Sequence, residues 1–162
     1  MSDRPRHVPA GYHMLTPYLI IDGAARAIEF YRKAFGATEV MRLDGPAGKV
    51  GHAELTIGDS KVMLADEFPE MDARGPAHFG GSPISLHLYV EDADAAVARA
   101  IAAGATAGRP VEDQFYGDRI GSVKDPFGYV WWCATRRQTY GVDELKRRSA
   151  EYMKEQMKKQ NR

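Results

Sequence analysis

Apolar residues in the first half of the chain follow a strand pattern, then a helix pattern, then three more strand patterns. Residues alternate in character over Met14–Ile21, as in a half-buried strand. Asp22 then precedes Ala24–Phe35, where apolar residues recur with the period of a helix, and it is predicted to cap that helix. Gly36 is placed to end the helix. The strands predicted after it are Thr38–Leu43, Val50–Ile57 and Lys61–Asp66.

The second half of the chain repeats this order. Ile84–Val90 alternates as a strand, and Asp92 is placed to begin a helix that runs through Ala103. The run Asp125-Pro126-Phe127-Gly128 has the residues of a tight turn, so the strands on its two sides are predicted to form a β-hairpin. The strands predicted here are a short one near Ala107–Pro110 and the hairpin strands Arg119–Lys124 and Tyr129–Thr135.

Matching segments support an internal duplication. Gly36-Ala37-Thr38 and Gly104-Ala105-Thr106 occupy equivalent positions 68 residues apart. We therefore predict an α+β fold of two tandem βαβββ modules, which form curved mixed sheets around a cavity, followed by a C-terminal helix. The predicted parts are an N-terminal arm (1–13), module 1 (14–66), a linker loop (67–83), module 2 (84–135) and a helical tail (136–162).

Two of these parts leave alternatives open. The 67–83 segment is rich in proline and glycine, and a loop of this length is a linker or a functional lid. The helix predicted at Val142–Lys158 either packs on its own domain or reaches a second subunit.

Composition removes several classes of partner. The chain has 162 residues, of which 44% are hydrophobic, and 22 basic residues balance 22 acidic ones, so no basic surplus suggests a nucleic-acid partner. No apolar run is long enough to span a bilayer, so no membrane partner is expected. Cys133 is the single cysteine and lies in an apolar strand, which predicts a buried thiol and a cytoplasmic protein without disulfides.

Strand alternation predicts where polar side chains gather. In the strands Val50–Ile57 and Ile84–Val90, apolar residues share one face, which is expected to pack on the helices. The other faces are polar and aromatic, and they are expected to line an inner cavity that binds a small molecule, unless they are open to solvent. The residues of these other faces are His52, Glu54 and Thr56 in the first strand and Ser85, His87 and Tyr89 in the second.

From these faces and from the loop before the hairpin we select candidate site residues. Glu54 is a candidate general base, and His87 could stabilise developing charge. The loop residues are either ligand contacts or are held in place by an Asp118–Arg119 pair. The candidate ligand-binding residues are Tyr18, His52, Tyr89, Tyr116, Arg119, Ser122 and Trp132.

The duplicated unit resembles the vicinal oxygen chelate superfamily, which includes glyoxalase I and the bleomycin-resistance proteins, and is most similar to its PhnB-like branch. The resemblance implies two modules around a cavity, usually in a homodimer. It covers roughly residues 14–135. The segments that carry it are Pro17–Ala24 with Ile28–Tyr31, His52–Leu55, Ser85–Val90 and Asp113–Trp132.

The resemblance also raises the question of a metal. Enzymes of the superfamily hold a divalent metal with one side chain from the first and last strands of each module. Matched through the 68-residue repeat, these positions fall on Thr16, Leu64, Ser85 and Trp132, which are not usual metal ligands. We therefore expect no cofactor. The alternative is a divalent metal at a rebuilt site of His87, Glu54 and His52.

These observations favour a protein that binds a small organic molecule in a metal-free aromatic and polar cavity and thereby sequesters the compound. The alternative is a glyoxalase-like lyase, isomerase or epimerase, which would be metal-dependent if the rebuilt site forms. A third interpretation is a partner-binding module that uses the C-terminal helix. No glycine-rich nucleotide loop after a strand supports a methyl-donor site.

Overall fold

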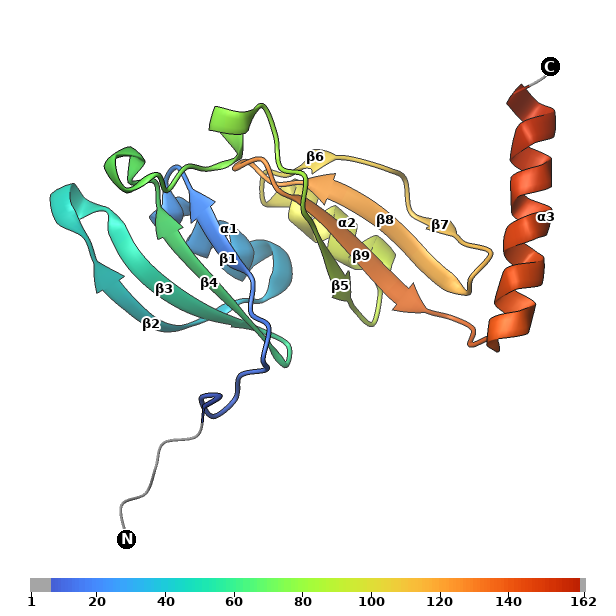
Figure 1. The fold of residues 1–162 in the computed structure, drawn as a ribbon, viewed down its shortest axis with the longest axis horizontal. Coiled ribbons are helices and arrows are strands. Elements are labelled where there is room, and N and C mark those ends of the chain that lie inside the picture. Colours follow the sequence, from blue (N-terminus) through green and yellow to red (C-terminus); the bar gives the residue numbers. More distant parts are fainter. Residues whose placement is uncertain (1–6, 161–162) are drawn as a thin grey trace, which may run out of the picture.

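The computed structural model describes residues 7–160, and each half of it forms a mixed β-sheet with one helix behind it (Figure 1). In module 1 the strand order is β1-β4-β3-β2, with β1 parallel to β4 and the other pairs antiparallel. The elements of this module are β1 (Tyr18–Ile21), α1 (Ala24–Phe35), β2 (Thr38–Asp44), β3 (Val50–Ile57) and β4 (Ser60–Asp66).

Module 2 repeats the arrangement with the order β5-β9-β8-β6, in which β5 is parallel to β9, and β7 also pairs with β8. The predicted α+β fold with two βαβββ units and a C-terminal helix is confirmed, and the sheets are open rather than closed into barrels. The elements are β5 (Ser85–Tyr89), α2 (Ala93–Ala102), β6 (Thr106–Ala107), β7 (Glu112–Asp113), β8 (Asp118–Lys124), β9 (Val130–Arg136) and α3 (Val142–Gln160).

The start of α1 differs from the sequence prediction. Asp22 does not cap the helix, because the N-cap residue is Gly23, with φ of 90°. The free N–H groups of Gly23 and Ala24 donate instead to Asp66 Oδ1, each at 2.9 Å. Asp66 is buried at the end of β4, so the last strand of the module holds the start of its helix.

The start of α2 follows the prediction more closely. Asp92 Oδ1 accepts a hydrogen bond from the N–H of Ala95 at 3.0 Å, as an N-cap residue does. Thr135 at the end of β9 adds a second acceptor, since its Oγ1 lies 2.9 Å from the N–H of Ala93. In both modules, therefore, the last strand contributes a side chain to the helix start.

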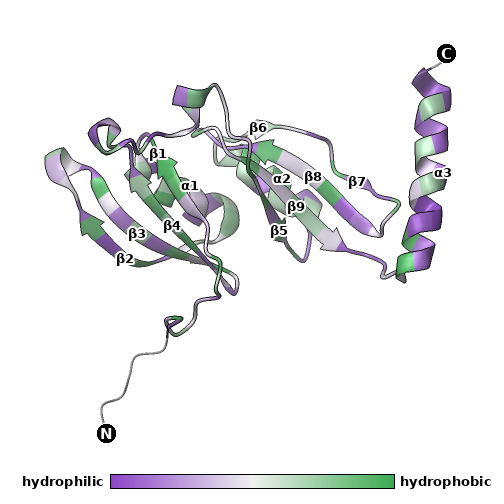
Figure 2. Ribbon diagram, viewed as in Figure 1, coloured by the Kyte–Doolittle hydropathy of each residue, from purple (hydrophilic) through white to green (hydrophobic). Residues whose placement is uncertain are grey.

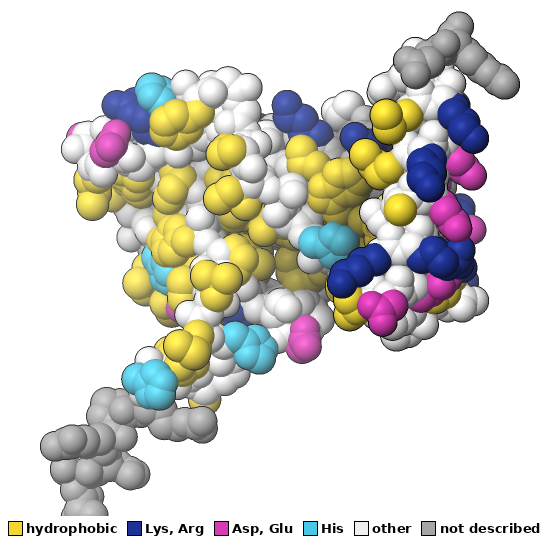
Figure 3. All heavy atoms as spheres, turned by 45° about the vertical axis from the view of Figure 1, so that its right-hand side comes forward, with side chains coloured by type: hydrophobic (Ala, Val, Ile, Leu, Met, Phe, Trp, Pro, Cys, Tyr) yellow, Lys and Arg dark blue, Asp and Glu magenta, His cyan; other side chains and the backbone are white. Residues whose placement is uncertain are grey.

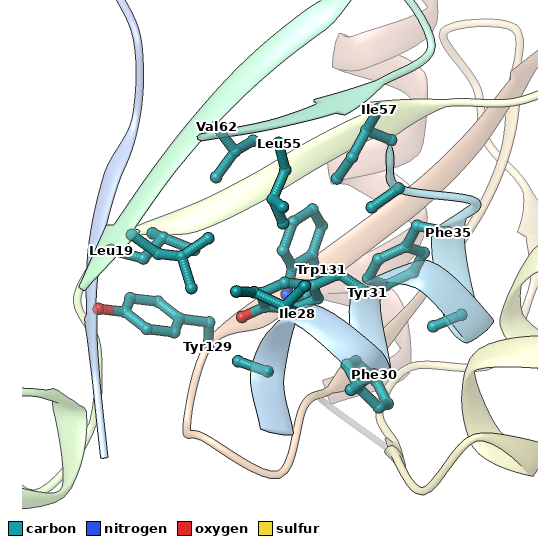
Figure 4. Packing of buried hydrophobic residues seen from close by; sticks show 14 of the residues in the cluster. Leu19, Ile28, Phe30, Tyr31, Phe35, Leu55, Ile57, Val62, Tyr129 and Trp131 are labelled. Atoms are coloured by element: carbon teal, nitrogen blue, oxygen red, sulfur yellow. The ribbon is translucent and has the colours of Figure 1, made fainter. Parts of the chain in front are cut away.

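One hydrophobic core joins the two modules, because α1 and α2 pack against each other behind the sheets (Figures 1 and 4). The Trp131 ring from β9 lies 4.5 Å from that of Phe35 and 5.1 Å from that of Tyr31, both on α1. Asp125, in the turn before β9, is buried and accepts a hydrogen bond from the Tyr31 hydroxyl at 2.8 Å. The modules are thus fixed to each other through the helix of module 1 and the hairpin of module 2.

The two sheets turn their apolar faces to this core, as predicted. Ala53, Leu55 and Ile57 of β3 are buried, and Figure 2 shows hydrophilic and hydrophobic residues alternating along this strand. We call the opposite faces of the two sheets the polar face of module 1 and the polar face of module 2. Since both helices lie behind the sheets, both polar faces open to the same broad side of the molecule (Figure 1).

The segments before β1 and between the modules differ from the predictions in where regular structure begins. The strand predicted from Met14 begins at Tyr18, and the 67–83 loop contains two short 3-10 turns, Pro69–Met71 and Pro76–Phe79. The predicted arm at 1–13 lies partly outside the described residues. Cys133 is fully buried, as predicted, and burial raises the pKa of its thiol to about 11. No helix within residues 7–160 is long and apolar enough to cross a bilayer.

Candidate functional site

The polar face of module 1 carries a row of side chains across three strand pairs. Tyr18 on β1 is in register with Met63 on β4, which faces Glu54 on β3, which faces Met41 on β2. His52 lies two residues before Glu54 and therefore points to the same face. The row alternates polar groups with flexible thioethers, a combination that suits contact with an amphipathic ligand.

A chain of hydrogen bonds runs along this face. The hydroxyl of Tyr12, from the segment before β1, donates to Glu54 Oε2. The other carboxylate oxygen of Glu54 lies 3.3 Å from His52 Nε2, and His52 Nδ1 lies 2.8 Å from the Tyr18 hydroxyl. Four side chains from the segment before β1, from β1 and from β3 thus form one connected network on the side of the sheet opposite the helix.

The protonation states of Tyr12 and Glu54 are linked by the hydrogen bond between them. Burial, followed by the hydrogen bond to Glu54, raises the pKa of Tyr12 to about 12, so its hydroxyl remains a donor. The same hydrogen bond is the main reason that the pKa of Glu54 lies below its usual range, and His52 lowers it further. Glu54 is therefore an ionised acceptor at neutral pH. Lys61 adds positive charge nearby, since its Nζ lies 5.4 Å from the centre of the Tyr12 ring.

The polar face of module 2 is built in the same way but is more aromatic. His87 on β5 is in register with Trp132 on β9, which faces Ser122 on β8. The ring of Tyr89 lies 4.8 Å from that of His87, and the guanidinium of Arg109 lies 5.9 Å from the Trp132 ring. The face thus offers flat rings together with one imidazole and one cation.

A second network anchors Tyr89 and the loop before β8. The Tyr89 hydroxyl donates to Asp118 Oδ2 at 3.1 Å and accepts from Arg136 Nη2 at 3.0 Å, and Arg136 also pairs with Asp118. The predicted pair between Asp118 and Arg119 is therefore wrong, because Arg136 takes the carboxylate. Burial raises the pKa of Tyr116, which lies beside this network, with the charge of Asp118 contributing.

Two of the candidate ligand-binding residues are not accessible to a ligand on these faces. Arg119 lies on the helix side of its sheet, where its Nε and Nη2 donate to Asp94 of α2 at 2.6 and 2.8 Å. Ser122 points to the polar face but is buried, and its Oγ accepts a hydrogen bond from the N–H of Arg109 at 2.9 Å. The structure thus gives Arg119 a structural ion pair and covers Ser122 with the loop that carries Arg109.

The candidate acid–base groups do not converge within one chain. Glu54 and His52 belong to module 1, whereas His87 belongs to module 2. Residues 7–160 contain no group of three or more histidine, cysteine or acidic side chains placed to hold a metal ion. Figure 3 shows histidine side chains exposed on the same side over both halves of the molecule. Within a single chain, the rebuilt site of His87, Glu54 and His52 does not form.

The four positions matched to the metal ligands of the superfamily need one correction. Leu64 is fully buried in the core, and Met63 is the residue on the polar face. Tyr18 pairs with Met63 as His87 pairs with Trp132, so the repeat is one residue longer in these strands than the 68-residue spacing suggests. With Met63 in place of Leu64, the donor set still does not fit a divalent metal, because a thioether and an indole replace hard donors.

Among the pockets of the described residues, three involve candidate site residues or the loops beside them. The 67–83 loop borders an apolar pocket of about 490 Å³, whose lining includes Tyr18, Phe79 and Ile84. His87 lines a smaller pocket of about 190 Å³ with Thr16 and Lys61. A polar pocket of about 540 Å³ lies at the loop before β8. Its lining includes Asp113, Gln114, Gly117, Asp118 and Arg119, from the end of β7 to the start of β8.

Sequence reasoning missed four residues of the polar faces. Tyr12 lies in an irregular segment, where no periodic pattern shows which way a side chain points. Met63 was hidden by the one-residue difference between the repeats, and Met41 by a register shift in β2 between positions 39 and 41. Arg109 lies in a loop whose course depends on its contact with β8. Alternation along β4 could have identified Met63.

Comparison with known proteins agrees with the duplicated fold. An uncharacterised protein of Mycobacterium tuberculosis strain H37Rv is 46% identical to this chain over 134 residues, which are 81% of this chain and 79% of that protein. The X-ray structure of an Arabidopsis thaliana gene product matches with a TM-score of 0.61 and 30% identity, covering 76% of this chain and 98% of that one.

A structure from Bacillus cereus, described as a putative 3-demethylubiquinone-9 3-methyltransferase, PhnB protein, has a TM-score of 0.57 over 76% of this chain and 99% of that one. Its identity of 19% shows a shared fold only. The family model of the Glyoxalase/Bleomycin resistance protein/Dioxygenase superfamily matches residues 12–133, which is well over half of the chain. This protein therefore belongs to the Glyoxalase/Bleomycin resistance protein/Dioxygenase superfamily.

Proposed function

We propose that this protein binds a small, planar organic molecule between the polar face of module 1 in one chain and the polar face of module 2 in a second chain. The observation that carries the proposal is the network of Tyr12, Glu54, His52 and Tyr18. Connected and partly buried polar groups on a sheet face that the helices of the described chain do not cover are typical of a recognition surface. Such a site can sequester a compound by binding alone, without a chemical step, so sequestration is the simplest function.

A homodimer is proposed because one chain leaves the site half built. The two polar faces open to the same side, and the Glu54 carboxylate lies on one face whereas the Trp132 and Tyr89 rings lie on the other. Two chains related by a twofold axis would place unlike faces opposite each other twice and enclose two equivalent cavities. The homodimers that the family resemblance implies are consistent with this arrangement.

The chemistry of the two faces suggests the class of ligand. Trp132 and Tyr89 offer flat rings on which a planar molecule can stack. The ionised Glu54 accepts hydrogen bonds, so a ligand with a hydroxyl or amino group is favoured over an anion. No cofactor is included in the proposal, because the side chains at the matched metal-ligand positions do not fit a divalent cation.

The alternative of a lyase, isomerase or epimerase has less support. A general base works best when its pKa lies near the operating pH. The hydrogen bond from Tyr12 moves the pKa of Glu54 in the opposite direction, below its usual range. Glu54 is thus better suited to orient a ligand than to remove a proton from one.

A thermal-shift screen of uncharged phenols, naphthols and flavonoids tests the proposal. A ligand present at a hundred times its Kd stabilises the folded state by about 2.7 kcal/mol, which is a rise in Tm of roughly 5–10 °C for a domain of this size. We expect the Trp132→Ala variant to lose this shift. Phe79→Ala, which changes the apolar pocket beside the 67–83 loop, is the matched control and should keep it. A shift lost in Phe79→Ala but kept in Trp132→Ala would move the site to that pocket, and no shift with any compound would contradict the proposal.

A further inference from the structure

The C-terminal helix α3 packs only loosely on module 2 and buries none of its residues. It lies outside residues 12–133, the part of the chain that the family model covers. Its contacts with module 2 include a stack of the Tyr152 and Phe115 rings at 5.0 Å and a hydrogen bond from Arg148 to the carbonyl of Phe115 at 3.3 Å. Arg148 also lies over the ring of Tyr140. No residue of α3 is fully buried.

One face of α3 nevertheless carries large apolar side chains. Val142, Met153 and Met157 are 67%, 56% and 61% exposed, and their spacing corresponds to whole turns of a helix, so they form one stripe. Arg147 pairs with Glu144 and Glu151 elsewhere on the helix. Figure 3 shows hydrophobic side chains of α3 on the side nearer the sheets and charged ones gathered on the other side. We call Val142, Met153 and Met157 the α3 stripe.

A second exposed apolar surface lies at the far end of the molecule. Met41 and Leu43 on the edge strand β2 face Glu54 and His52 on β3, so they belong to the polar face of module 1. They are 38% and 55% exposed. Figure 1 places β2 and α3 at opposite ends of the long axis, with the two polar faces between them. We call Met41 and Leu43 the β2 rim.

We propose that the α3 stripe of one chain packs on the β2 rim of a second copy of this chain and closes the outer end of the shared cavity. The inference rests on the dimer of the proposed function and adds to it the element that completes the site. A twofold axis that places module 1 opposite module 2 of the other chain exchanges the two ends of the molecule. The same rotation therefore brings each α3 to the β2 end of the other chain.

A second copy is favoured over other occupants because both surfaces belong to this chain and flank the same two faces. One symmetric association covers both stripes and both rims and leaves neither to a further partner. Pairing of the two α3 helices with each other would cover the stripes but would leave each β2 rim in water. The partner would thus contribute apolar side chains beside Glu54, the acceptor of the binding network.

Engineered cysteines test this contact in the full-length protein. The native Cys133 is fully buried, and burial raises the pKa of its thiol, so it should not react under native conditions. We expect the double variant Met153→Cys with Leu43→Cys to form covalent dimers with a short bismaleimide. The two positions lie at opposite ends of one chain, so a bridge between them has to join two chains. Met71→Cys with Leu43→Cys is the matched control and should form no covalent dimer, because Met71 is 77% exposed but its segment lies beside the β2–β3 hairpin of the same chain, so a bridge to Leu43→Cys stays within one chain.

The other outcomes are decisive. Crosslinking of the single variant Met153→Cys would show that the two helices pair with each other, and it would overturn the inference. A dimer in sedimentation equilibrium that gives no crosslink in the double variant would overturn the α3 contact and leave the proposed dimer intact. A monomer at all concentrations would overturn both. As a second readout, Met153→Lys with Met157→Lys should weaken self-association at least tenfold, whereas Met71→Lys should leave it unchanged.

Discussion

The buried carboxylate of Asp125 is the clearest single determinant of how the two modules are joined. Its Oδ2 accepts from the Tyr31 hydroxyl at 2.8 Å and from Trp131 Nε1 at 2.9 Å. Its Oδ1 accepts from the N–H groups of Phe127 and Tyr129, both at 2.9 Å. Four donors therefore converge on one side chain that is 3% exposed.

Replacement of Asp125 should destabilise the protein strongly. A hydrogen bond to a charged group contributes roughly 1.5–3 kcal/mol, and a buried donor left without an acceptor carries a further penalty. Water can satisfy the partly buried N–H of Phe127, whereas the donors of Tyr129, Tyr31 and Trp131 are buried. Asp125→Ala should therefore lower the free energy of unfolding by about 4–5 kcal/mol, out of the roughly 5–15 kcal/mol typical of a domain.

Two further variants make this prediction specific. Asp125→Asn keeps the size but offers an NH₂ group to two of the four donors, so it should cost about 2–3 kcal/mol. Tyr31→Phe removes one donor and leaves the carboxylate with three, so it should cost about 1–2 kcal/mol. Urea unfolding followed by tryptophan fluorescence, at one fixed protein concentration, measures all three. An Asp125→Asn variant within about 1 kcal/mol of the natural protein would refute the reasoning.

Four other predictions concern individual groups. Because the Tyr12 hydroxyl is the main cause of the low pKa of Glu54, Tyr12→Phe should raise that pKa, as carbon-detected NMR titration of the carboxyl group would show; an unchanged value would argue against the hydrogen bond. The folded-state pKa of Glu54 is lowered, so the stability that its ionised carboxylate contributes is present above its unfolded-state pKa of about 4.3. This stability is lost as the pH falls through the folded-state pKa. The stability of Glu54→Gln should therefore depend less on pH than that of the natural protein when both are unfolded by acid. Cys133 should resist a thiol reagent at pH 8 and react at once in urea, and fast native labelling would contradict its burial. Gly128→Ala should cost about 2 kcal/mol or more in urea unfolding, because Gly128 has φ of 99° and a Cβ there would lie 2.8 Å from Pro76 Cβ; a neutral result would contradict the turn geometry.

Local patterns were sufficient to predict most of the fold. The alternation in Val50–Ile57 gave the bounds and the two faces of β3, and the helical period gave those of α1. Asp125-Pro126-Phe127-Gly128 was recognised as a turn from its residues alone. The four hydrogen bonds to Asp125 were not predictable, because two of the donors come from α1 and β9.

The errors arose where a distant contact decided the local structure. Asp22 has the right type and position for a helix cap, but Asp66, which is distant in sequence, takes that function. Arg119 has a neighbouring acid in the sequence, yet it pairs with Asp94 on α2. In both cases the actual hydrogen-bond partner is set by the packing of a helix on a sheet, which no local sequence pattern shows.

The candidate site was predictable in part. Alternation identified His52, Glu54 and His87 as members of polar faces, since the period of a strand is fixed. Their separation between the two modules was not readable, because alternation says nothing about how two sheets are placed. The spacing error at Leu64 arose because the two hairpin connections differ by one residue: four residues separate the paired Thr56 and Lys61, whereas five separate the equivalent Lys124 and Val130.

The central claim is that each binding site takes the Glu54 carboxylate from one chain and the Trp132 ring from another. A complementation experiment with a ligand from the thermal-shift screen tests it directly. Glu54→Gln disables the polar face of module 1, and Trp132→Ala disables that of module 2, so each variant alone should not bind. An equal mixture of the two, unfolded and refolded together, should recover about a quarter of the sites, because each mixed dimer has one intact pair of faces. If mixed dimers form and the mixture still does not bind the ligand, the account is contradicted.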